Sequence, residues 1–369
     1  MMPRDSVTTN ELNFSAGPGA LPESVLRQAQ QAILALPETG LSVLGMSHRS
    51  PWFEEILQES ERNLRELLDI PDRYCVLFMQ GGSSLQFSMI PMNFARGLAP
   101  AAHIRSGYWS AKAIEEARCV APIDVVWDGH ANDYRALPDP SALEIPDDAP
   151  YVHYVSNETI EGLQFAQTPA GRQVPWIADM SSDFLSKSIN FDGHAMIYAH
   201  AQKNVGPAGV TICIIDKDLL KQIPDGLPAM LDYRTHFRHG SNYNTPPVFG
   251  IYVLALVTRW LRDTIGGVQN MAAINRTKAD TLYRTLDQLE GVIDTHADRP
   301  FRSTMNAAFR FRDERLNPLF LAQANAAGLE GLAGHRSLGG LRASMYNAVT
   351  ERAIGHLAEF LSTFSTAHG

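Results

Sequence analysis

The chain has 369 residues, so a sizeable hydrophobic core is expected, and length alone favours about two domains. Hydrophobic residues at 45% and charged residues at 19% are ordinary for a folded globular protein and exclude a disordered chain. A net charge of -9 argues against nucleic acid or an anionic membrane surface as a partner, so an anionic ligand needs a local basic pocket.

Targeting and redox signals are weak along the whole chain. Residues 1–10 contain no apolar signal core, and the longest apolar stretch, 248–257, is too short to span a bilayer. We therefore expect a cytoplasmic location. Cys75, Cys119 and Cys213 are widely spaced, which argues against a disulfide framework or a zinc site. We expect all three to be reduced core or strand residues, and no metal site.

In chain order, short β-rich runs alternate with longer amphipathic runs, which is typical of an α/β sheet with helical crossovers. The predicted strands are 75–79, 125–127, 151–155, 176–178, 195–198 and 210–215. A helix is predicted to begin after Ser50, because Pro51 and two glutamates follow, and to end at 69–71. Further helices are predicted from Leu85 and over about 247–262.

The Gly266-Gly267 pair ends the long helical run. Beyond it the chain resumes with a helix, short strands around Phe309 and Phe311, and a final helix. We place a change of domain at this point.

Lys203 is the most informative single residue. It lies between two apolar segments and precedes a glycine- and proline-containing turn, which suits a reactive amine at the end of a strand. Asp179 ends an apolar run, where its carboxylate can pair with a protonated pyridine nitrogen. On position alone, a surface-loop lysine is the commoner interpretation, and Asp179 serves equally well as a turn cap. Together, however, the two residues predict a pyridoxal-phosphate enzyme.

The run Gly81-Gly82-Ser83-Ser84 lies between a predicted strand and a predicted helix. Its N–H groups and hydroxyls would converge where the helix dipole is positive, which predicts a phosphate-binding cup. A tight βα turn explains this loop equally well, and the loop matches neither the P-loop nor the full dinucleotide fingerprint.

Two further side chains suit a flat heteroaromatic ligand. Trp109 can stack on such a ring, and the hydroxyl of Thr159 can reach a ring substituent. A core tryptophan and a turn threonine are the structural alternatives.

Residues 331–350 contain His335, Arg336 and Arg342 but no acid, which predicts recognition of phosphate and carboxylate through guanidinium contacts. The pair His48-Arg49, directly before a predicted helix, offers a second basic cluster. A solvated basic surface is the alternative for each cluster.

Taken together, these residues resemble the phosphoserine aminotransferase family, a class V group of fold-type-I pyridoxal-phosphate enzymes. The resemblance rests on runs in family order, namely Asn13-Phe14-Ser15-Ala16-Gly17-Pro18, Ser47-His48-Arg49, Asn157-Glu158-Thr159, Ala201-Gln202-Lys203-Asn204, Asn244-Thr245-Pro246-Pro247, Gly334-His335-Arg336 and Arg342-Ala343-Ser344-Met345-Tyr346-Asn347. It implies a large domain over 17–262 with a mostly parallel sheet, and a smaller α+β domain formed by 1–16 and 263–369.

The resemblance also implies roles for individual residues. Lys203 would form the Schiff base with pyridoxal 5′-phosphate, Asp179 would bind the pyridine nitrogen and Trp109 would stack on the ring. The remaining cofactor contacts would come from Ser83, Ser84, Thr159 and Gln202, and from Asn244 and Thr245 reaching into the neighbouring subunit of a homodimer. Substrate phosphate and carboxylate would be bound by His48, Arg49, His335, Arg336 and Arg342, the last three in part across the dimer interface.

One departure from the family pattern concerns the glycine loop. Many members carry an arginine there, where this chain has Ser84. The grip on the cofactor phosphate would then be weaker or redistributed.

The implied reaction is a ping-pong transamination in which glutamate and 3-phosphohydroxypyruvate yield 2-oxoglutarate and O-phosphoserine, a step of serine biosynthesis. Use of 4-phosphohydroxy-threonine, in pyridoxine biosynthesis, stays open. The alternatives are another class V enzyme, such as an alanine-glyoxylate type aminotransferase or a cysteine desulfurase, and a non-catalytic phosphoanion-binding protein. A desulfurase needs a mobile nucleophilic cysteine, and the three cysteines lie in apolar or helical contexts.

Overall fold

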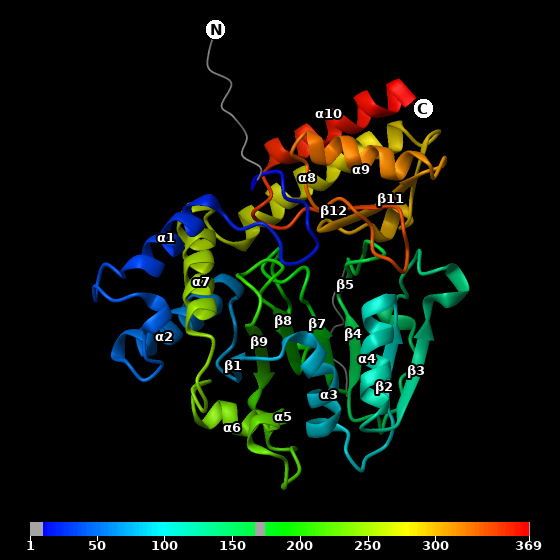
Figure 1. Ribbon diagram of the computed structural model, residues 1–369. Helices are drawn as coiled ribbons and strands as arrows, with labels where there is room; N and C mark the ends of the chain where they lie inside the picture. The colour runs from blue at the N-terminus through cyan, green and yellow to red at the C-terminus, as the bar shows by residue number, and fades with distance from the viewer. Residues whose placement is uncertain (1–9, 167–173, 369) are drawn as a thin grey trace.

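The computed structural model describes residues 10–166 and 174–368, and its centre is a seven-stranded sheet (Figure 1). In spatial order its strands are β1 (Tyr74–Met79), β9 (Thr211–Asp216), β8 (Met196–His200), β7 (Trp176–Asp179), β4 (Val152–Val155), β2 (Ala101–Arg105) and β3 (Ile123–Asp128). Strand β9 runs antiparallel to both of its neighbours, and the other adjacent pairs are parallel. The predicted α/β class with a mostly parallel central sheet is confirmed.

The six strands predicted for this sheet are all present, with ends shifted by one or two residues. Strand β2 was not predicted, because its sequence Ala-Ala-His-Ile-Arg has a single β-branched residue and little to mark it as a strand. A short hairpin of β5 (Asn157–Glu158) and β6 (Leu163–Gln164) was also not predicted.

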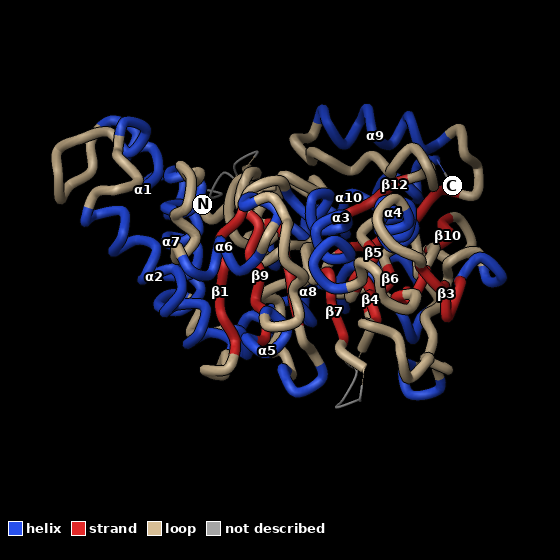
Figure 2. The backbone as a smooth tube through the Cα atoms, turned by 90° about the horizontal axis from the view of Figure 1, so that it is seen from below, coloured by secondary structure: helices blue, strands red, loops and turns tan. Residues whose placement is uncertain are grey.

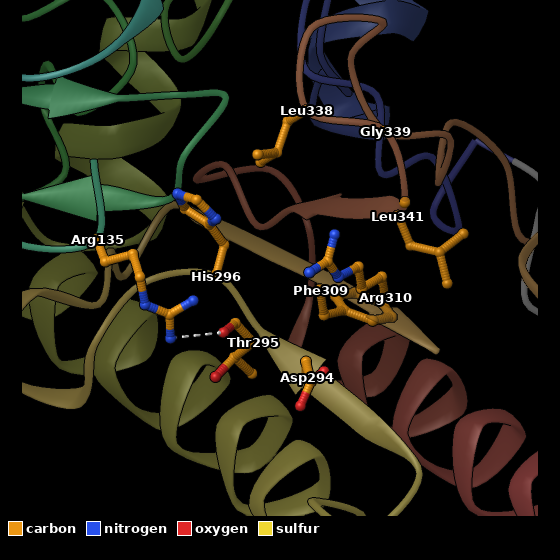
Figure 3. A pocket seen from close by; sticks show the side chains of 10 residues that line it. Arg135, Asp294, Thr295, His296, Phe309, Arg310, Leu338, Gly339 and Leu341 are labelled. Atoms are coloured by element: carbon orange, nitrogen blue, oxygen red, sulfur yellow. Dashed lines mark hydrogen bonds between the residues drawn. The ribbon is translucent and has the colours of Figure 1, made fainter. Parts of the chain in front are cut away.

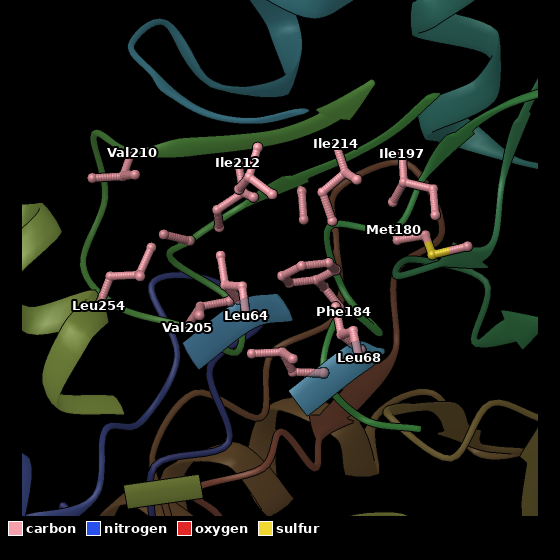
Figure 4. Close-up of a cluster of buried hydrophobic side chains, with 14 of the residues drawn as sticks. Leu64, Leu68, Met180, Phe184, Ile197, Val205, Val210, Ile212, Ile214 and Leu254 are labelled. Atoms are coloured by element: carbon pink, nitrogen blue, oxygen red, sulfur yellow. The ribbon is translucent and has the colours of Figure 1, made fainter. Parts of the chain in front are cut away.

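Helices cover both faces of the large sheet. One face packs against α2 (Pro51–Leu68) and α7 (Val248–Arg259), and the other against α3 (Gly82–Phe94) and α4 (Tyr108–Arg118). Figure 4 shows Leu64 and Leu68 of α2 and Leu254 of α7 meeting Ile212 and Ile214 of β9. The residues of each strand thus alternate between two separate apolar clusters, which is why the buried strands read as continuous apolar runs.

The predicted limits of α2 and α7 are confirmed. The Ser50 hydroxyl accepts a hydrogen bond from the N–H of Phe53 at 3.2 Å, and Asp69 ends α2 in the left-handed conformation. Helix α7 continues through a π-helical turn, Trp260–Thr264, before the Gly266-Gly267 pair.

A second, antiparallel sheet of β10 (Ile293–Thr295), β11 (Asn306–Phe311) and β12 (Leu341–Ser344) carries its own hydrophobic core with α8 (Val268–Gln288), α9 (Leu316–Ala326) and α10 (Glu351–His368). Phe14 is fully buried in this core, and its carbonyl accepts a hydrogen bond from the N–H of Ser344 at 3.1 Å. The division into 17–262 and 1–16 with 263–369 stays a prediction, and residues 1–9 lie outside the described part of the chain.

The remaining helices are α1 (Glu23–Leu34), α5 (Lys217–Leu220) and α6 (Tyr233–Arg238). In Figure 2, α1, α2 and α7 lie together at the β1 end of the sheet, and β3 lies at the opposite end. Among the described residues, no helix combines the length and the apolarity needed to cross a membrane.

The cysteines only partly follow the prediction. Cys75 and Cys213 are buried on β1 and β9, as expected. Cys119 is exposed at the end of α4, so the prediction that it is a core or strand residue was wrong. Its apolar neighbours in sequence belong to the turn between α4 and β3, where the side chain points away from the core.

Candidate active site

A cavity of about 490 Å³ opens beside the carboxyl ends of β4, β7 and β8, the edge at which open α/β sheets bind ligands. Nine of the residues predicted for the site line it, namely Ser83, Ser84, Trp109, Thr159, Asp179, Gln202, Lys203, His335 and Arg342. Residues separated by up to 259 positions in the sequence are thereby brought to one place.

Lys203 follows β8 and reaches the cavity with a free amine. Among residues 10–166 and 174–368, no hydrogen bond or ion pair of its Nζ atom is found. Gly17 packs directly against its side chain, since a Cβ atom on Gly17 would lie 3.0 Å from Cδ and Cε of Lys203. Because Gly17 also has a φ of +141°, a larger residue there would strain the backbone and crowd the lysine.

Asp179 is the last residue of β7 and is only 4% exposed. Burial raises the pKa of Asp179 to about 6, while the N–H of Ser181, the positive charge of Lys203 and the hydroxyl of Tyr198 favour the ionised form. The Ser181 N–H donates to Oδ1 at 2.8 Å. The site therefore holds a desolvated carboxylate beside an amine.

The glycine loop forms the first turn of α3. This helix begins at Gly82, three residues before the predicted start, and Gly81 caps it with a φ of 92°. The first intrahelical bond is donated by the N–H of Leu85 to the carbonyl of Gly81, so the N–H groups of Gly82, Ser83 and Ser84 precede it. Those N–H groups and the helix dipole suit an anion.

Two buried carboxylates hold the start of α4, which carries Trp109. Glu158 accepts hydrogen bonds from the N–H groups of Trp109 and Ser110, each at 3.0 Å. Glu161 accepts one from the N–H of Tyr108 at 2.9 Å, and its buried Oε2 atom has no hydrogen-bond partner in the part of the chain that the structure describes. Burial, together with the charge of Glu158, raises the pKa of Glu161 to about 8. The start of the helix that carries Trp109 is thus fixed by two acids to which the sequence analysis assigned no role.

Arg342 and His335 supply basic groups at the cavity wall. The buried Nε atom of Arg342 has no hydrogen-bond partner among residues 10–166 and 174–368, and the charge of Arg342 acts on Glu161. The His335 ring lies 4.8 Å from the ring of Tyr108, and its Nδ1 atom is 2.7 Å from the Ser337 hydroxyl.

Five predicted site residues do not line this cavity, namely His48, Arg49, Asn244, Thr245 and Arg336. The segments that carry the first four are joined, because the side chain of Asn242 donates to the carbonyl of His48 at 2.9 Å. Gln80, next to the glycine loop, donates to the carbonyl of Thr245 at 3.1 Å. Arg336 is exposed.

Sequence reasoning missed several residues that line the cavity, namely Ala16, Gly17, Asn157, Ser181, Ser182 and His200. Ser181 and Ser182 follow directly after the strand that ends in Asp179, and His200 ends the strand before Lys203. Their position just after parallel strands is the signal that would have identified them. Ala16 and Gly17 follow no strand of the large sheet, so that signal is absent for them.

A smaller cavity of about 230 Å³ lies beside the loop that links His335 to Arg342 (Figure 3). Its lining includes Leu338 and Gly339, so this loop borders both cavities. The cationic Arg135 and Arg310 of this smaller cavity already face the acids Asp298 and Glu314. Within the described residues, no cluster of three or more metal-ligating side chains is found.

Comparison with known proteins gives one consistent match. The family model for class-V aminotransferases matches residues 11–357. A phosphoserine aminotransferase of Laribacter hongkongensis is 46% identical over 357 residues, which cover 97% of this chain and 99% of that protein. The solved structure of phosphoserine aminotransferase from Bacillus circulans subsp. alkalophilus has a TM-score of 0.94 and 42% identity, covering 97% and 99% of the two chains. A structure describing radiation damage of the Schiff base in phosphoserine aminotransferase has a TM-score of 0.93 and 44% identity, covering 96% and 99%.

Proposed function

The chain belongs to the class-V aminotransferase family, and from that premise we propose that it transfers the amino group of glutamate to 3-phosphohydroxypyruvate, yielding 2-oxoglutarate and O-phosphoserine. The chain is an enzyme, and its cofactor is pyridoxal 5′-phosphate. The observation that carries the proposal is the meeting of Lys203, Asp179, the start of α3 and Arg342 in one cavity.

The cavity fits pyridoxal phosphate in size and in chemistry. Its volume of about 490 Å³ lies within the ~300–1,000 Å³ typical of small-molecule sites. The N–H groups at the start of α3, with the hydroxyls of Ser83 and Ser84, suit the phosphate, and Trp109 suits the ring. We propose that Thr159 and Gln202 complete the cofactor contacts. With serine in place of arginine at position 84, the phosphate grip rests on N–H groups and hydroxyls.

When bound, pyridoxal phosphate would supply an electron sink for the substrate Cα atom, which would make the proton there more acidic. Lys203 then acts as the base and acid that moves this proton between Cα and the cofactor C4′ atom. The Asp179 carboxylate keeps the pyridine nitrogen protonated, which sustains the electron withdrawal. Glu158 accepts from the backbone N–H of Trp109, which holds in place the first turn of α4 that carries this side chain.

The second half-reaction uses the same residues in reverse order. Arg342 and His335, at the cavity wall, bind the anionic groups of both substrates in turn. Lys203 returns the proton to the Cα atom of the product, so no additional acid or base is required.

We also propose that the enzyme is a cytoplasmic homodimer. The support is that His48, Arg49, Asn244, Thr245 and Arg336 lie outside the cavity of their own chain. In a dimer, Asn244 and Thr245 would reach the cofactor phosphate in the neighbouring subunit. His48, Arg49 and Arg336 would bind the substrate phosphate or carboxylate there. Mass measurement in solution, before and after mutation of exposed Thr245, tests this arrangement.

The lining of the cavity does not support the alternative that this fold acts as a cysteine desulfurase. A desulfurase needs a nucleophilic cysteine at the substrate, and none of Cys75, Cys119 and Cys213 lines the cavity. Cys75 and Cys213 are buried, and burial raises the pKa of the Cys75 thiol to about 11, which disfavours the reactive thiolate.

The test of the cofactor role is spectroscopic. We expect the purified protein to be yellow, and we expect borohydride to fix the chromophore on Lys203, as read by peptide mass spectrometry. A colourless protein that gains no colour with added pyridoxal phosphate would contradict the proposed function.

The test of substrate choice is a comparison of kcat/KM for phosphoserine and for an unphosphorylated amino acid. Arg336→Ala should reduce the value for phosphoserine by about 10- to 100-fold, because a charge-assisted contact contributes roughly 1.5–3 kcal/mol, and should spare the other substrate. Arg310→Ala, which removes another exposed arginine from outside the cavity, is the matched control. Equal losses on both substrates would refute the phosphate role. Parallel kinetics with 4-phosphohydroxy-threonine measure its use directly.

A further inference from the structure

Asp179 is connected to a series of buried polar side chains that leads away from the cavity. Tyr198 is the register partner of Asp179 on the neighbouring strand, and its hydroxyl favours the ionised form of that carboxylate. The same hydroxyl lies 2.8 Å from Nε2 of His153. The His153 ring stacks on that of His103 at 4.8 Å. All four side chains are at least 96% buried.

Strand register explains why these residues meet. Tyr198 on β8 is paired with Asp179 on β7, and His103 on β2 is paired with His153 on β4. Strand β7 lies between β8 and β4, so the hydrogen bond between Tyr198 and His153 spans β7, on which Ile177 is the register partner of His153. The series therefore runs laterally across four strands of the sheet, on the face that packs against α3 and α4.

The number of available protons limits these hydrogen bonds to two arrangements. A tyrosine hydroxyl has one proton to donate and a lone pair to accept. If Tyr198 donates to an ionised Asp179, then His153 must donate to Tyr198 from a protonated Nε2. If Nε2 instead carries no proton, Tyr198 donates to it, and the bond to Asp179 survives only when that carboxyl is protonated.

We propose that Tyr198 and His153 are positioning residues that keep Asp179 ionised opposite the cofactor pyridine nitrogen, with His153 in the Nε2–H tautomer. This inference rests on the proposed function, because it concerns how Asp179 serves the ring. Neither residue touches the cavity, so each acts through Asp179.

Lys203 also favours the ionised form of Asp179, but it does so from the cavity, whereas Tyr198 and His153 lie within the sheet. The groups that face the series are Lys203 and Ser181 at Asp179, and Tyr233 and Cys213 at Tyr198. His103 faces His153 on the far side. Burial lowers the pKa of His153 to about 3, so the ring stays neutral and chooses only between its two tautomers.

The opposite face of the sheet holds a comparable pair with the opposite proton arrangement. Tyr154 lies 2.7 Å from Nε2 of His194, and both residues are buried. Nδ1 of His194 is 2.9 Å from the carbonyl of Asn190, so Nδ1 carries the proton and Nε2 accepts from the tyrosine. Nδ1 of His153 has no partner within the described residues, so its tautomer is set by the Asp179 side.

The decisive experiment compares Tyr198→Phe with Tyr154→Phe, since each removes one buried hydroxyl from a Tyr–His pair. Apoprotein affinity for pyridoxamine 5′-phosphate, which forms no covalent bond to Lys203, should fall about 3- to 10-fold in the first variant only. The pH midpoint of the visible absorbance change of the holoenzyme should also rise in the first variant only. The reason is that a pyridine ring without its nitrogen proton withdraws less charge from the nitrogen of Lys203, so that nitrogen keeps its own proton to a higher pH.

The histidine variants separate positioning from packing. His153→Gln retains an N–H donor and should keep the wild-type affinity and pH midpoint, whereas His153→Leu should behave like Tyr198→Phe. In ¹⁵N-histidine NMR of the holoenzyme, the signal lost in His153→Gln should report Nε2–H, and the signal lost in a His194 variant should report Nδ1–H.

Two results would overturn the inference while leaving the function intact. One is that Tyr198→Phe and Tyr154→Phe show the same affinity for pyridoxamine 5′-phosphate and the same pH midpoint, while the wild-type protein binds the cofactor and transaminates. The other is an Nδ1–H tautomer for His153. A wild-type protein that binds neither cofactor form would instead overturn the proposed function itself.

Discussion

Lys203 and Lys278 are two enclosed lysines with opposite surroundings. Lys278, on α8, is fully buried, and its Nζ atom donates to three carbonyl oxygens, those of Met345, Tyr346 and Val349, each at 2.9 Å. Lys203 lines the cavity, and within the described residues no hydrogen bond of its amine is found. A lysine whose donors are all satisfied stabilises the fold, whereas one left without partners is available for chemistry.

The geometry at Lys278 is that of an ammonium group. Burial lowers the pKa of Lys278 to about 7, although the charge of Glu351 acts in the opposite direction. A neutral amine has only two N–H bonds, however, and three carbonyls at 2.9 Å require three donors. The carbonyl cradle therefore opposes the desolvation penalty and favours the charged form, which ties α8 to the segment after β12.

The largest expected effect follows from removing the unsatisfied lysine. Lys203→Ala should reduce kcat for transamination by about 10⁴-fold, because one residue supplies both the covalent attachment and the proton transfer. Its free energy of unfolding should change by less than about 1 kcal/mol, since no hydrogen bond is lost. Steady-state kinetics and urea denaturation of the apoprotein measure the two quantities. Transamination at the wild-type rate would refute the mechanism.

The satisfied lysine should show the reverse pattern. Lys278→Met keeps the apolar stem but leaves three buried carbonyls without a donor, and the free energy of unfolding should fall by about 3–4 kcal/mol. The affinity for pyridoxal phosphate in the protein that remains folded should change little. Lys221→Met, at an exposed lysine, is the control and should cost less than about 0.5 kcal/mol. A loss at Lys278 no larger than that of the control would break the comparison.

The contrast between the two lysines also shows what the sequence could predict. Lys203 was identified because it follows a clear strand and precedes a glycine turn, and Asp179 because it ends another strand; both signals are local. Lys278 sits in an amphipathic helix among polar neighbours, and its burial depends on carbonyls about 70 residues away. No local pattern carries that information.

The same limit applies to the fold. Strands rich in valine and isoleucine, such as β9, were predicted, whereas β2 was missed because alanine occupies its first two positions. His103 and His153 lie on adjacent strands, yet a histidine in an apolar run has many uses, and only the register shows that they stack.

Glu161 extends the comparison, because it is another buried ionisable group, and its Oε2 atom has no hydrogen-bond partner among the described residues. Burial raises the pKa of Glu161 from 4.5 to about 8, so the folded state binds more protons than the unfolded state between these values. The free energy of unfolding should therefore fall as pH rises from about 5 to 8. Glu161→Gln should remove most of this fall, measured by urea denaturation across the pH range.

The control for this pH effect is Glu115→Gln, at an exposed acid paired with Lys112. Its pH dependence should match that of the wild type. If the pH dependence of Glu161→Gln also matched that of the wild type, the Glu161 carboxyl would have to be ionised over the whole pH range. Its Oε2 atom would then have to form a direct ion pair with Arg342.

The smallest expected effect concerns the residue that joins the two lysines. The carbonyl of Tyr346 accepts from Lys278, and its hydroxyl donates at 2.8 Å to the carbonyl of Ala16, next to the glycine that packs against Lys203. Tyr346→Phe keeps the carbonyl contact with Lys278 but removes the hydroxyl, which donates to Ala16 and accepts from the Asn306 side chain at 3.5 Å. The substitution should cost about 1 kcal/mol of unfolding free energy. If the bond to Ala16 also holds the cavity wall in place, KM for glutamate should rise about twofold while kcat stays constant. A fall in kcat without any loss of stability would instead mean that the Tyr346 hydroxyl acts on the chemistry of Lys203. In that case Tyr346 would link the two lysines functionally, and the division into a structural lysine and a reactive lysine would be wrong at this residue.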